Sequence, residues 1–323
     1  MRALVVAALA LVACSSDATS TTTPPKKPGT LTEADRRVAI GDVSALSPHL
    51  QRAFDPIDHE PMRRPGMNDW LDAHPEPGQT FAQHRDAKFP PPDDARNVLY
   101  LLPLGEFPAD APSLATLSRL VRAYYGLEVR VLPAVPLADV VATRRGTDRY
   151  GDPAQMKSPE VLRWLVPRVP TDGFALLALT MMDLYPSDDW NYVFGQASFR
   201  DRVGVQSFAR QDPAFYDQAR PDDWKQLVLR RAAWTIIHEI GHTFGLHHCI
   251  YFECIFAGAN HQTEADSRPL HACPVCTRKL HRALGFDPAT REDRLADVFD
   301  TLGFTDEAAW SKRRATWIRT GER

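Results

Sequence analysis

Apolar positions follow two different patterns along the chain, and the change comes near residue 95. Residues 33–95 hold scattered proline, aspartate and histidine with weak periodicity, which predicts an irregular extension with one or two short helices. Beyond that point, apolar residues recur with strand or helix spacing. Strands are predicted at 97–104, 127–132, 174–184, 192–199 and 203–208, and helices at 113–125 and 158–165. This order of elements predicts an α/β sandwich.

A longer helix is predicted at 224–246, directly after the residues Pro221-Asp222-Asp223. Proline is tolerated in the first helical turn, and the two carboxylates suit its positive end. The segment has no internal proline and is apolar on more than one side, which is typical of a buried helix.

Composition narrows the class of protein only modestly. The 323 residues suffice for one large domain or two modest ones, and 44% hydrophobic and 24% charged residues are ordinary values for a globular protein. The formal net charge of -3 gives no electrostatic reason to expect nucleic acid as a partner.

The N-terminus has the pattern of an export signal. Arg2 precedes the apolar run 3–12, which is too short to span a bilayer and ends in Leu11-Val12-Ala13-Cys14. These four residues resemble the lipobox of bacterial lipoproteins, which implies lipidation of Cys14 and a place in the cell envelope. The alternative is an ordinary secretory signal with an incidental cysteine.

These patterns predict three parts of the chain. Residues 1–14 form the signal, 15–95 a Ser/Thr/Pro-rich tether with the irregular extension, and 96–323 the main domain. No other segment approaches transmembrane length, so we expect any anchoring to be through lipid.

The chemistry is concentrated at the end of the long helix. His238 and His242 are four residues apart, so their imidazoles project from one helix face and can bind one Zn²⁺. Gly245 can take a positive φ, end the helix and return the chain toward the metal. His248 then stands where the metzincin pattern H-E-x-x-H-x-x-G-x-x-H has its third ligand. The neighbouring His247 is expected to point elsewhere.

Glu239 follows the first histidine, which places its carboxylate beside the metal rather than on it. There it can accept a proton from an activated water molecule and deliver it to the leaving nitrogen of a peptide bond. The alternative is a helix whose histidines only pack or make hydrogen bonds.

Four of the five cysteines fall in one short stretch as two close pairs. The pairs are Cys249 with Cys254 and Cys273 with Cys276, a spacing typical of a structural zinc site with four thiolates. The alternative is two disulfides, or one disulfide and free thiols, because an exported protein meets an oxidising environment.

Together these residues resemble the archaemetzincin (archaelysin) family, whose pattern is H-E-x-x-H-x-x-G-x-x-H-C, then x4-C-x-M and a later C-x-x-C. Similar stretches at 183–186, 190–198 and 204–210 extend the resemblance to roughly 97–290. The resemblance implies a metzincin-like domain with a mixed twisted sheet, a backing helix, an active-site helix and a small zinc-stabilised C-terminal subdomain. It also implies a catalytic zinc on the three histidines, Glu239 as general base and a structural zinc on the four cysteines.

One position departs from the family pattern. The family has methionine two residues after the second cysteine, in the turn beneath the metal, where this chain has Phe256. Phenylalanine can still supply an apolar floor, but it is bulkier and stiffer than methionine.

Two further residues or stretches have open roles. Residues 192–198 either pair with extended substrate as an edge strand or only form a core or cleft wall. Asp183 either supports the histidines or caps the end of a strand.

The sequence therefore predicts a zinc metallopeptidase that hydrolyses peptide or protein substrates, acting as a monomer at a bacterial membrane. The alternative is a degenerate zinc-binding envelope lipoprotein that binds peptides or partners without cleaving them. Phe256 favours the second hypothesis, whereas the intact Glu239 favours the first. The sequence does not distinguish endopeptidase from aminopeptidase action.

Overall fold

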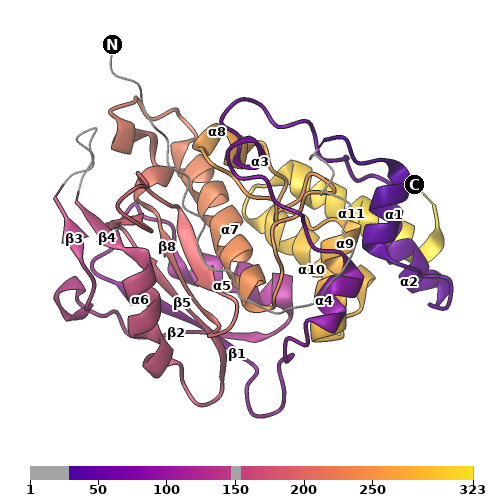
Figure 1. The fold of residues 1–323 in the computed structure, drawn as a ribbon, viewed down its shortest axis with the longest axis horizontal. Helices are drawn as coiled ribbons and strands as arrows, with labels where there is room; N and C mark the ends of the chain where they lie inside the picture. The colour runs from indigo at the N-terminus through magenta and orange to yellow at the C-terminus, as the bar shows by residue number, and fades with distance from the viewer. Residues whose placement is uncertain (1–28, 147–153, 323) are drawn as a thin grey trace, which may run out of the picture.

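A twisted sheet with helices on both faces forms the centre of the molecule (Figure 1). The computed structural model describes residues 29–146 and 154–322. Five strands lie in the order β2-β1-β5-β8-β7. Their bounds are β1 Val98–Leu104, β2 Glu128–Val131, β5 Gly173–Thr180, β7 Gly195–Ser198 and β8 Val203–Ser207. The first four strands pair in parallel, and β7 runs antiparallel to β8 as an edge strand.

The central strands are buried on both faces. Alternate residues of β1 enter two different hydrophobic clusters: Leu99 and Leu101 join the larger one, while Val98 and Leu102 join the smaller one. Strands covered on both sides have continuous apolar sequences, which is the pattern seen in residues 98–104 and 173–179.

Helices cover the two faces of the sheet. The large cluster packs α5 (Leu114–Tyr125) and α7 (Trp224–Thr243) on one face, and the smaller cluster packs α6 (Ser158–Leu165) on the other. The Ser113 hydroxyl caps α5, and Gly126 in the left-handed conformation ends it. All three helices were predicted to within a few residues, and β1 and β8 likewise.

The strand predicted at 174–184 is wrong in its second half. The Thr180 hydroxyl accepts a hydrogen bond from the Met182 N–H, and the chain turns there. The following residues form β6 (Asp183–Tyr185), which pairs with β4 (Gln155–Lys157) in a separate three-stranded sheet that also contains β3 (Arg144–Arg145). A continuous apolar run therefore conceals a change of sheet.

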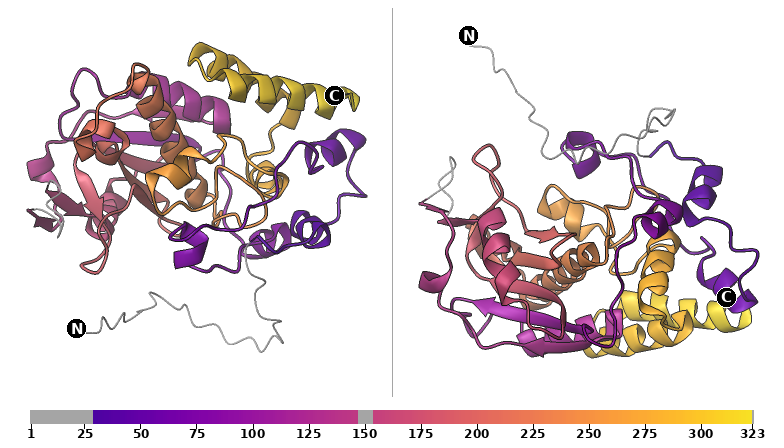
Figure 2. Two further views of the ribbon diagram at one scale, coloured as in Figure 1. Left: turned by 90° about the horizontal axis from the view of Figure 1, so that it is seen from above. Right: turned by 60° about the horizontal axis from the view of Figure 1, so that its bottom comes forward.

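The N-terminal extension has more helix than predicted and packs into the same core as the sheet. Its short helices are α1 Glu33–Ile40, α2 Pro48–Ala53, α3 Trp70–Ala73 and α4 Phe81–Asp86. Ile40, Phe54 and Met62 are buried members of the large cluster. Thr32 and Thr80 begin α1 and α4 with capping boxes. The indigo segment thus runs beside the orange and yellow C-terminal helices and then back toward α7 (Figures 1 and 2).

The remaining residues form the C-terminal part and short connections. The helices are α8 Gln262–Asp266, α9 Pro274–Leu284, α10 Pro288–Thr301 and α11 Thr305–Thr320. Single 3-10 turns are η1 Leu137–Asp139, η2 Val166–Arg168, η3 Ala209–Gln211 and η4 Pro213–Tyr216. Helices α10 and α11 pack against each other, and α10 also packs against α5. Among the described residues, no helix combines the length and apolar character needed to cross a membrane.

Candidate active site

Helix α7 brings three of the predicted site residues together. Every residue from Ala232 to Thr243 is buried, as expected for a helix that is apolar on several sides. His238 and His242 project from one face with their ring centroids 4.7 Å apart. Glu239 is also buried and lies one residue further around the helix.

The end of α7 turns the third histidine back toward the first two. Gly245 has φ +78°, and a Cβ atom at this position would lie 2.1 Å from the Phe89 ring. Only glycine fits both the left-handed backbone and this close approach. The ring of His248 consequently lies 5.2 Å from that of His238 and 5.1 Å from that of His242, centroid to centroid. The predicted role of Gly245 in ending the helix is confirmed.

Hydrogen bonds fix how each imidazole presents its nitrogens. Nδ1 of His238 lies 2.8 Å from the Ile255 carbonyl, and Nδ1 of His242 lies 2.6 Å from the Leu246 carbonyl. A carbonyl only accepts, so both Nδ1 atoms carry the proton and both Nε2 atoms present lone pairs. These two Nε2 atoms are 3.1 Å apart. Two facing lone pairs repel unless a cation lies between them, so this donor set fits a metal ion.

The protonation state of the histidines agrees with that role. Burial lowers the pKa of His242 to about 3, and burial with the neighbouring imidazoles lowers the pKa of His238 well below its ordinary value. The reactive nitrogens of the three histidines lie within 4.8 Å of one another. Neutral imidazoles at these distances are the ligands that Zn²⁺ prefers.

Glu239 is held in a dry position at the edge strand. Its Oε2 atom is buried and has no hydrogen-bond partner among the described residues. Burial raises the pKa of this carboxyl to about 8, so both protonation states are accessible near neutral pH. A Cβ atom on Gly195 of β7 would lie 2.6 Å from Glu239 Oε1. The absence of a side chain at Gly195 therefore gives the carboxylate its room.

A cleft of about 1020 Å³ opens over these residues. It is lined by the three histidines and Glu239, by residues 193–197 of the edge-strand region and by residues 74 and 76–78 of the N-terminal extension. Aromatic side chains on its walls are Trp70, Trp190, Tyr192, Phe194, Phe199 and Trp234. His247, expected to point away, also lines this cleft and lies against Phe199.

Phe256 forms the apolar floor of the site. It is fully buried, and its ring centroid lies 6.4 Å from that of His238. A Cβ atom on Gly241 would be 2.1 Å from Phe256 Cε1, so the ring occupies the space that this glycine leaves open. The bulkier residue is thus accommodated by close packing against α7.

The four predicted cysteines converge on one buried point. The sulfur atoms of Cys249, Cys254, Cys273 and Cys276 lie within 4.8 Å of one another, and none is in a disulfide. Burial alone raises the pKa of Cys249, but hydrogen bonds from the other three thiols lower it well below its ordinary value. Four sulfur atoms around one point fit a closed tetrahedral metal site.

Asp183 does not reach the histidines. Its carboxylate is buried and bonds instead to the Arg210 guanidinium at 2.8 Å and to the Gln155 amide at 2.6 Å. It therefore joins β6 to β4 and η3 and has no part in the metal site. Cys14 lies outside the described residues.

Sequence reasoning missed Glu76, which supports the third histidine. Glu76 Oε1 lies 2.8 Å from Nδ1 of His248 and 2.8 Å from the indole Nε1 of Trp70. Glu76 stands in an irregular stretch far from the motif, so no spacing signal could have identified it.

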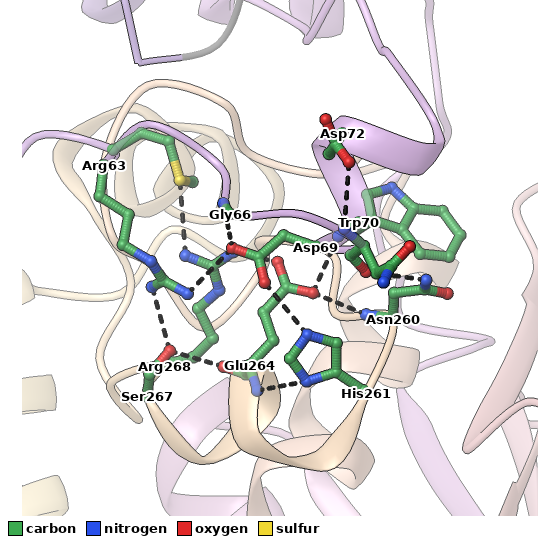
Figure 3. A network of polar contacts seen from close by, with 12 residues as sticks. Arg63, Gly66, Asp69, Trp70, Asp72, Asn260, His261, Glu264, Ser267 and Arg268 are labelled. Atoms are coloured by element: carbon green, nitrogen blue, oxygen red, sulfur yellow. Dashed lines mark hydrogen bonds and ion pairs between the residues drawn. The ribbon is translucent and has the colours of Figure 1, made fainter.

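A second missed feature is a polar network beside the cleft, which Figure 3 shows. Asp69 Oδ1 accepts from His261 Nε2 at 3.1 Å, and Glu264 Oε2 accepts from the backbone N–H of Trp70 at 2.8 Å. These three acidic and histidine side chains are grouped closely enough to ligate a metal. However, Arg268 bonds to Glu264 at 2.8 Å, and a protonated His261 nitrogen faces Asp69. The network therefore ties the extension to α8 rather than forming a metal site.

Comparisons with known proteins identify the family of this chain. Residues 168–282 match the model of Peptidase family M54. The chain is 33% identical over 293 residues to Archaemetzincin-2 of Pongo abelii, covering 80% of this chain and 81% of that protein. Archaemetzincin-2 of Homo sapiens gives the same identity and coverage. A crystal structure of archaemetzincin from Methanopyrus kandleri has a TM-score of 0.45 and 28% identity, covering 60% of this chain and 99% of that one. This chain belongs to the archaemetzincin family, Peptidase family M54.

Proposed function

We propose that this protein is a zinc-dependent peptidase whose catalytic zinc is held by His238, His242 and His248. The observation that carries the proposal is that the Nε2 atoms of His238 and His242 lie 3.1 Å apart with their lone pairs facing each other. Each ring is held in this orientation because its Nδ1 donates a hydrogen bond to a backbone carbonyl. Three histidine ligands leave one position open for catalysis. Membership of a peptidase family supports the same chemistry.

A zinc ion bound to these histidines supplies a Lewis acid that activates water and polarises a peptide carbonyl. Glu239 acts as the general base, because its carboxylate adjoins the ligand His238 and has one oxygen without a partner. It accepts the proton of the attacking water and passes it to the amine nitrogen as the C–N bond breaks.

Extended substrate fits along the edge strand. Strand β7 pairs with β8 on one side only, and residues 195–197 of β7 line the cleft. An edge strand offers unpaired backbone N–H and C=O groups to a peptide that lies beside it. Such pairing would bring a backbone carbonyl of the peptide past Glu239, which adjoins Gly195.

The four cysteines would hold a second, structural zinc. They are fully buried, and no open position faces the cleft, which fits a stabilising role rather than a catalytic one. Because Cys249 directly follows His248, this site would also hold the returning chain in place.

A degenerate binding protein is the second candidate, and Phe256 is the observation that favours it. The ring lies beneath His238 where the family pattern has methionine, and a stiff floor leaves the metal less freedom to change its geometry. This candidate keeps the zinc and the cleft but lacks hydrolysis.

The substitution Glu239→Gln distinguishes the two candidates. It keeps the shape of the side chain but removes its ability to take a proton, so we expect peptide cleavage to fall by at least about 100-fold. Zinc content, measured by elemental analysis, should stay at the wild-type value. Wild-type protein that retains zinc but cleaves nothing in a diverse peptide library would favour the binding protein.

A further inference from the structure

The third histidine depends on a segment far from the motif for its orientation. His238 and His242 bond to carbonyls that lie within 17 residues along the chain, whereas His248 bonds to Glu76, 172 residues away. The carboxylate is half-buried, with 26% of its side chain exposed, and it lines the cleft. The extension therefore contributes directly to the site.

The contact determines which nitrogen His248 offers to a metal. An ionised carboxylate only accepts hydrogen bonds, so Nδ1 of His248 must carry the proton and Nε2 is left with its lone pair. A glutamate carboxylate is ordinarily ionised at neutral pH, and Glu76 Oε1 lies 2.8 Å from His248 Nδ1 and 2.8 Å from the Trp70 indole nitrogen. A carboxylate on the far nitrogen also makes a ligating imidazole more basic.

Glu76 is itself held in place by Trp70. The indole Nε1 donates to Glu76 Oε1 at 2.8 Å, and the indole ring meets the His248 ring edge to face at 4.9 Å. The same indole lies over Gly258, where a Cβ atom would come within 2.4 Å of it. Glycine at 258 therefore admits the ring that positions the carboxylate.

The polar network of Figure 3 holds the start of this segment. Glu264 accepts from the backbone N–H of Trp70, and Asp69 accepts from His261 and from the backbone N–H of Gly66. Asp69 and Glu264 are buried, so breaking these bonds would leave buried charged groups with fewer partners. The network gives residues 66–76 one defined position beside the metal site.

We infer that Glu76 is a positioning residue for the third zinc ligand, so that residues 66–76 of the N-terminal extension are part of the metal site. The inference rests on the proposed function, because it assumes that His248 ligates zinc. A purely structural alternative is that the Glu76–His248 bond only fastens the extension to the domain and does not affect the metal.

The test compares Glu76→Gln with the matched control Glu60→Gln in the full chain. Glu60 belongs to the same extension, is exposed and lies outside the cleft that holds the histidines. Zinc affinity is measured by competition with a chromophoric chelator. We expect the Glu76 variant to bind zinc at the histidines about 10- to 100-fold more weakly, and the control to match wild type.

Two further readouts separate positioning from general damage. The cysteine site serves as an internal control, because its zinc should be retained equally in all variants. The visible spectrum of the cobalt-substituted protein should change in the Glu76 variant, since a reoriented His248 alters the ligand field. Trp70→Phe, which removes the indole N–H donor and part of the ring but keeps an aromatic side chain, should also weaken zinc binding, by less than Glu76→Gln.

Equal zinc affinity in the Glu76 variant and wild type would overturn the inference, whatever the peptidase activity. A loss of affinity in a protein that cleaves no peptide would support the inference while the proposed function fails. If wild-type protein and the His248→Ala variant hold the same amount of zinc, both the inference and the proposed function are wrong.

Discussion

Two glycines make room for close contacts around Glu239 and the three histidines. Gly195 lets the Glu239 carboxylate approach the edge strand, and Gly241 lets the Phe256 ring pack against α7 beneath the site. Neither has a left-handed backbone, so it is the missing side chain and not the backbone that matters at both positions. The site therefore depends on the room that glycines leave beside Glu239 and Phe256 as well as on the reactive side chains.

Gly195→Ala tests the space around Glu239. The added Cβ atom would lie 2.6 Å from Oε1 and 2.8 Å from the carboxyl carbon, so the carboxylate must move. Displacement of the proposed general base should lower kcat by roughly 100-fold. Zinc content should not change, because the three atoms nearest to the added Cβ all belong to Glu239.

The control for this substitution is Gly146→Ala, where an added Cβ atom would meet no atom of the described residues within 4 Å. Its kcat should equal that of wild type. An unchanged kcat in Gly195→Ala would show that catalysis does not require the present position of the Glu239 carboxylate.

Helix α7 is the element on which the site depends, and other elements lock its C-terminal end. His84 of α4 donates from Nε2 to the Phe244 carbonyl at 2.9 Å, just beyond the last helical residue. Gln79 bonds to the Gly245 carbonyl at 3.1 Å and so satisfies a second carbonyl at this helix end. The extension therefore supplies the polar partners that the turn after α7 lacks.

The buried His84 should make the fold sensitive to acid. Burial lowers its pKa to about 4 from an ordinary 6.5, so between these values the unfolded chain binds more protons than the folded one. The contribution of His84 to the free energy of unfolding is fully present above about pH 6.5 and is lost as the pH falls toward about 4. The loss should amount to roughly 2 kcal/mol between about pH 7 and about pH 5.

Urea unfolding in the presence of a zinc chelator measures this loss without a contribution from the metal. His84→Gln should flatten the dependence of the unfolding free energy on pH. If the unfolding free energy of the His84 variant depends on pH as in wild type, the acid sensitivity does not come from His84.

At the level of elements, local spacing was a good guide wherever a pattern was long and regular. Residues 224–243, 158–165 and 114–125 are helices as predicted, because each buries one or more faces with 3.6-residue periodicity. The run 174–184 was misjudged, since a strand that changes sheet keeps the same apolar composition on both sides of the turn.

At the scale of the whole molecule, the described part of the N-terminal extension packs against the peptidase domain (Figures 1 and 2). Residues 39–71 contribute side chains to the same hydrophobic cluster as α5 and α7. Arg278 of α9 bonds to the Ile40 carbonyl at 2.6 Å, and Arg314 of α11 bonds to the Ala53 carbonyl at 3.0 Å. The described part of the extension is therefore integral to the fold.

Elemental analysis of the whole chain should find two zinc ions. Cys276→Ser should leave one, because it removes a ligand of the closed cysteine site while the histidines remain intact. That variant should also unfold at lower temperature, since binding of a structural metal contributes to folding free energy. One zinc in wild type, retained in Cys276→Ser, would show that the cysteines hold no metal.

The lipid anchor at Cys14 stays a prediction. In a bacterial host, wild-type protein should fractionate with membranes and label with a radioactive fatty acid, whereas Cys14→Ala should do neither. Wild-type protein in the soluble fraction without label would support the ordinary secretory signal instead.

The sequence by itself determined the groups that are close along the chain. His238, Glu239 and His242 fall on adjoining helix faces because of the 3.6-residue repeat, and Gly245 returns His248 because its backbone can take φ +78°. The grouping of the four cysteines was also predictable, since the two members of each pair are close in the sequence and few residues separate the pairs.

Only the tertiary structure decided which distant groups support this motif. Glu76 reaches His248 across 172 residues, Gly195 makes room for Glu239 from another layer, and Trp70 fills the space over Gly258. Such contacts leave no periodic trace in the sequence, because they depend on how separately formed elements pack and not on local backbone geometry.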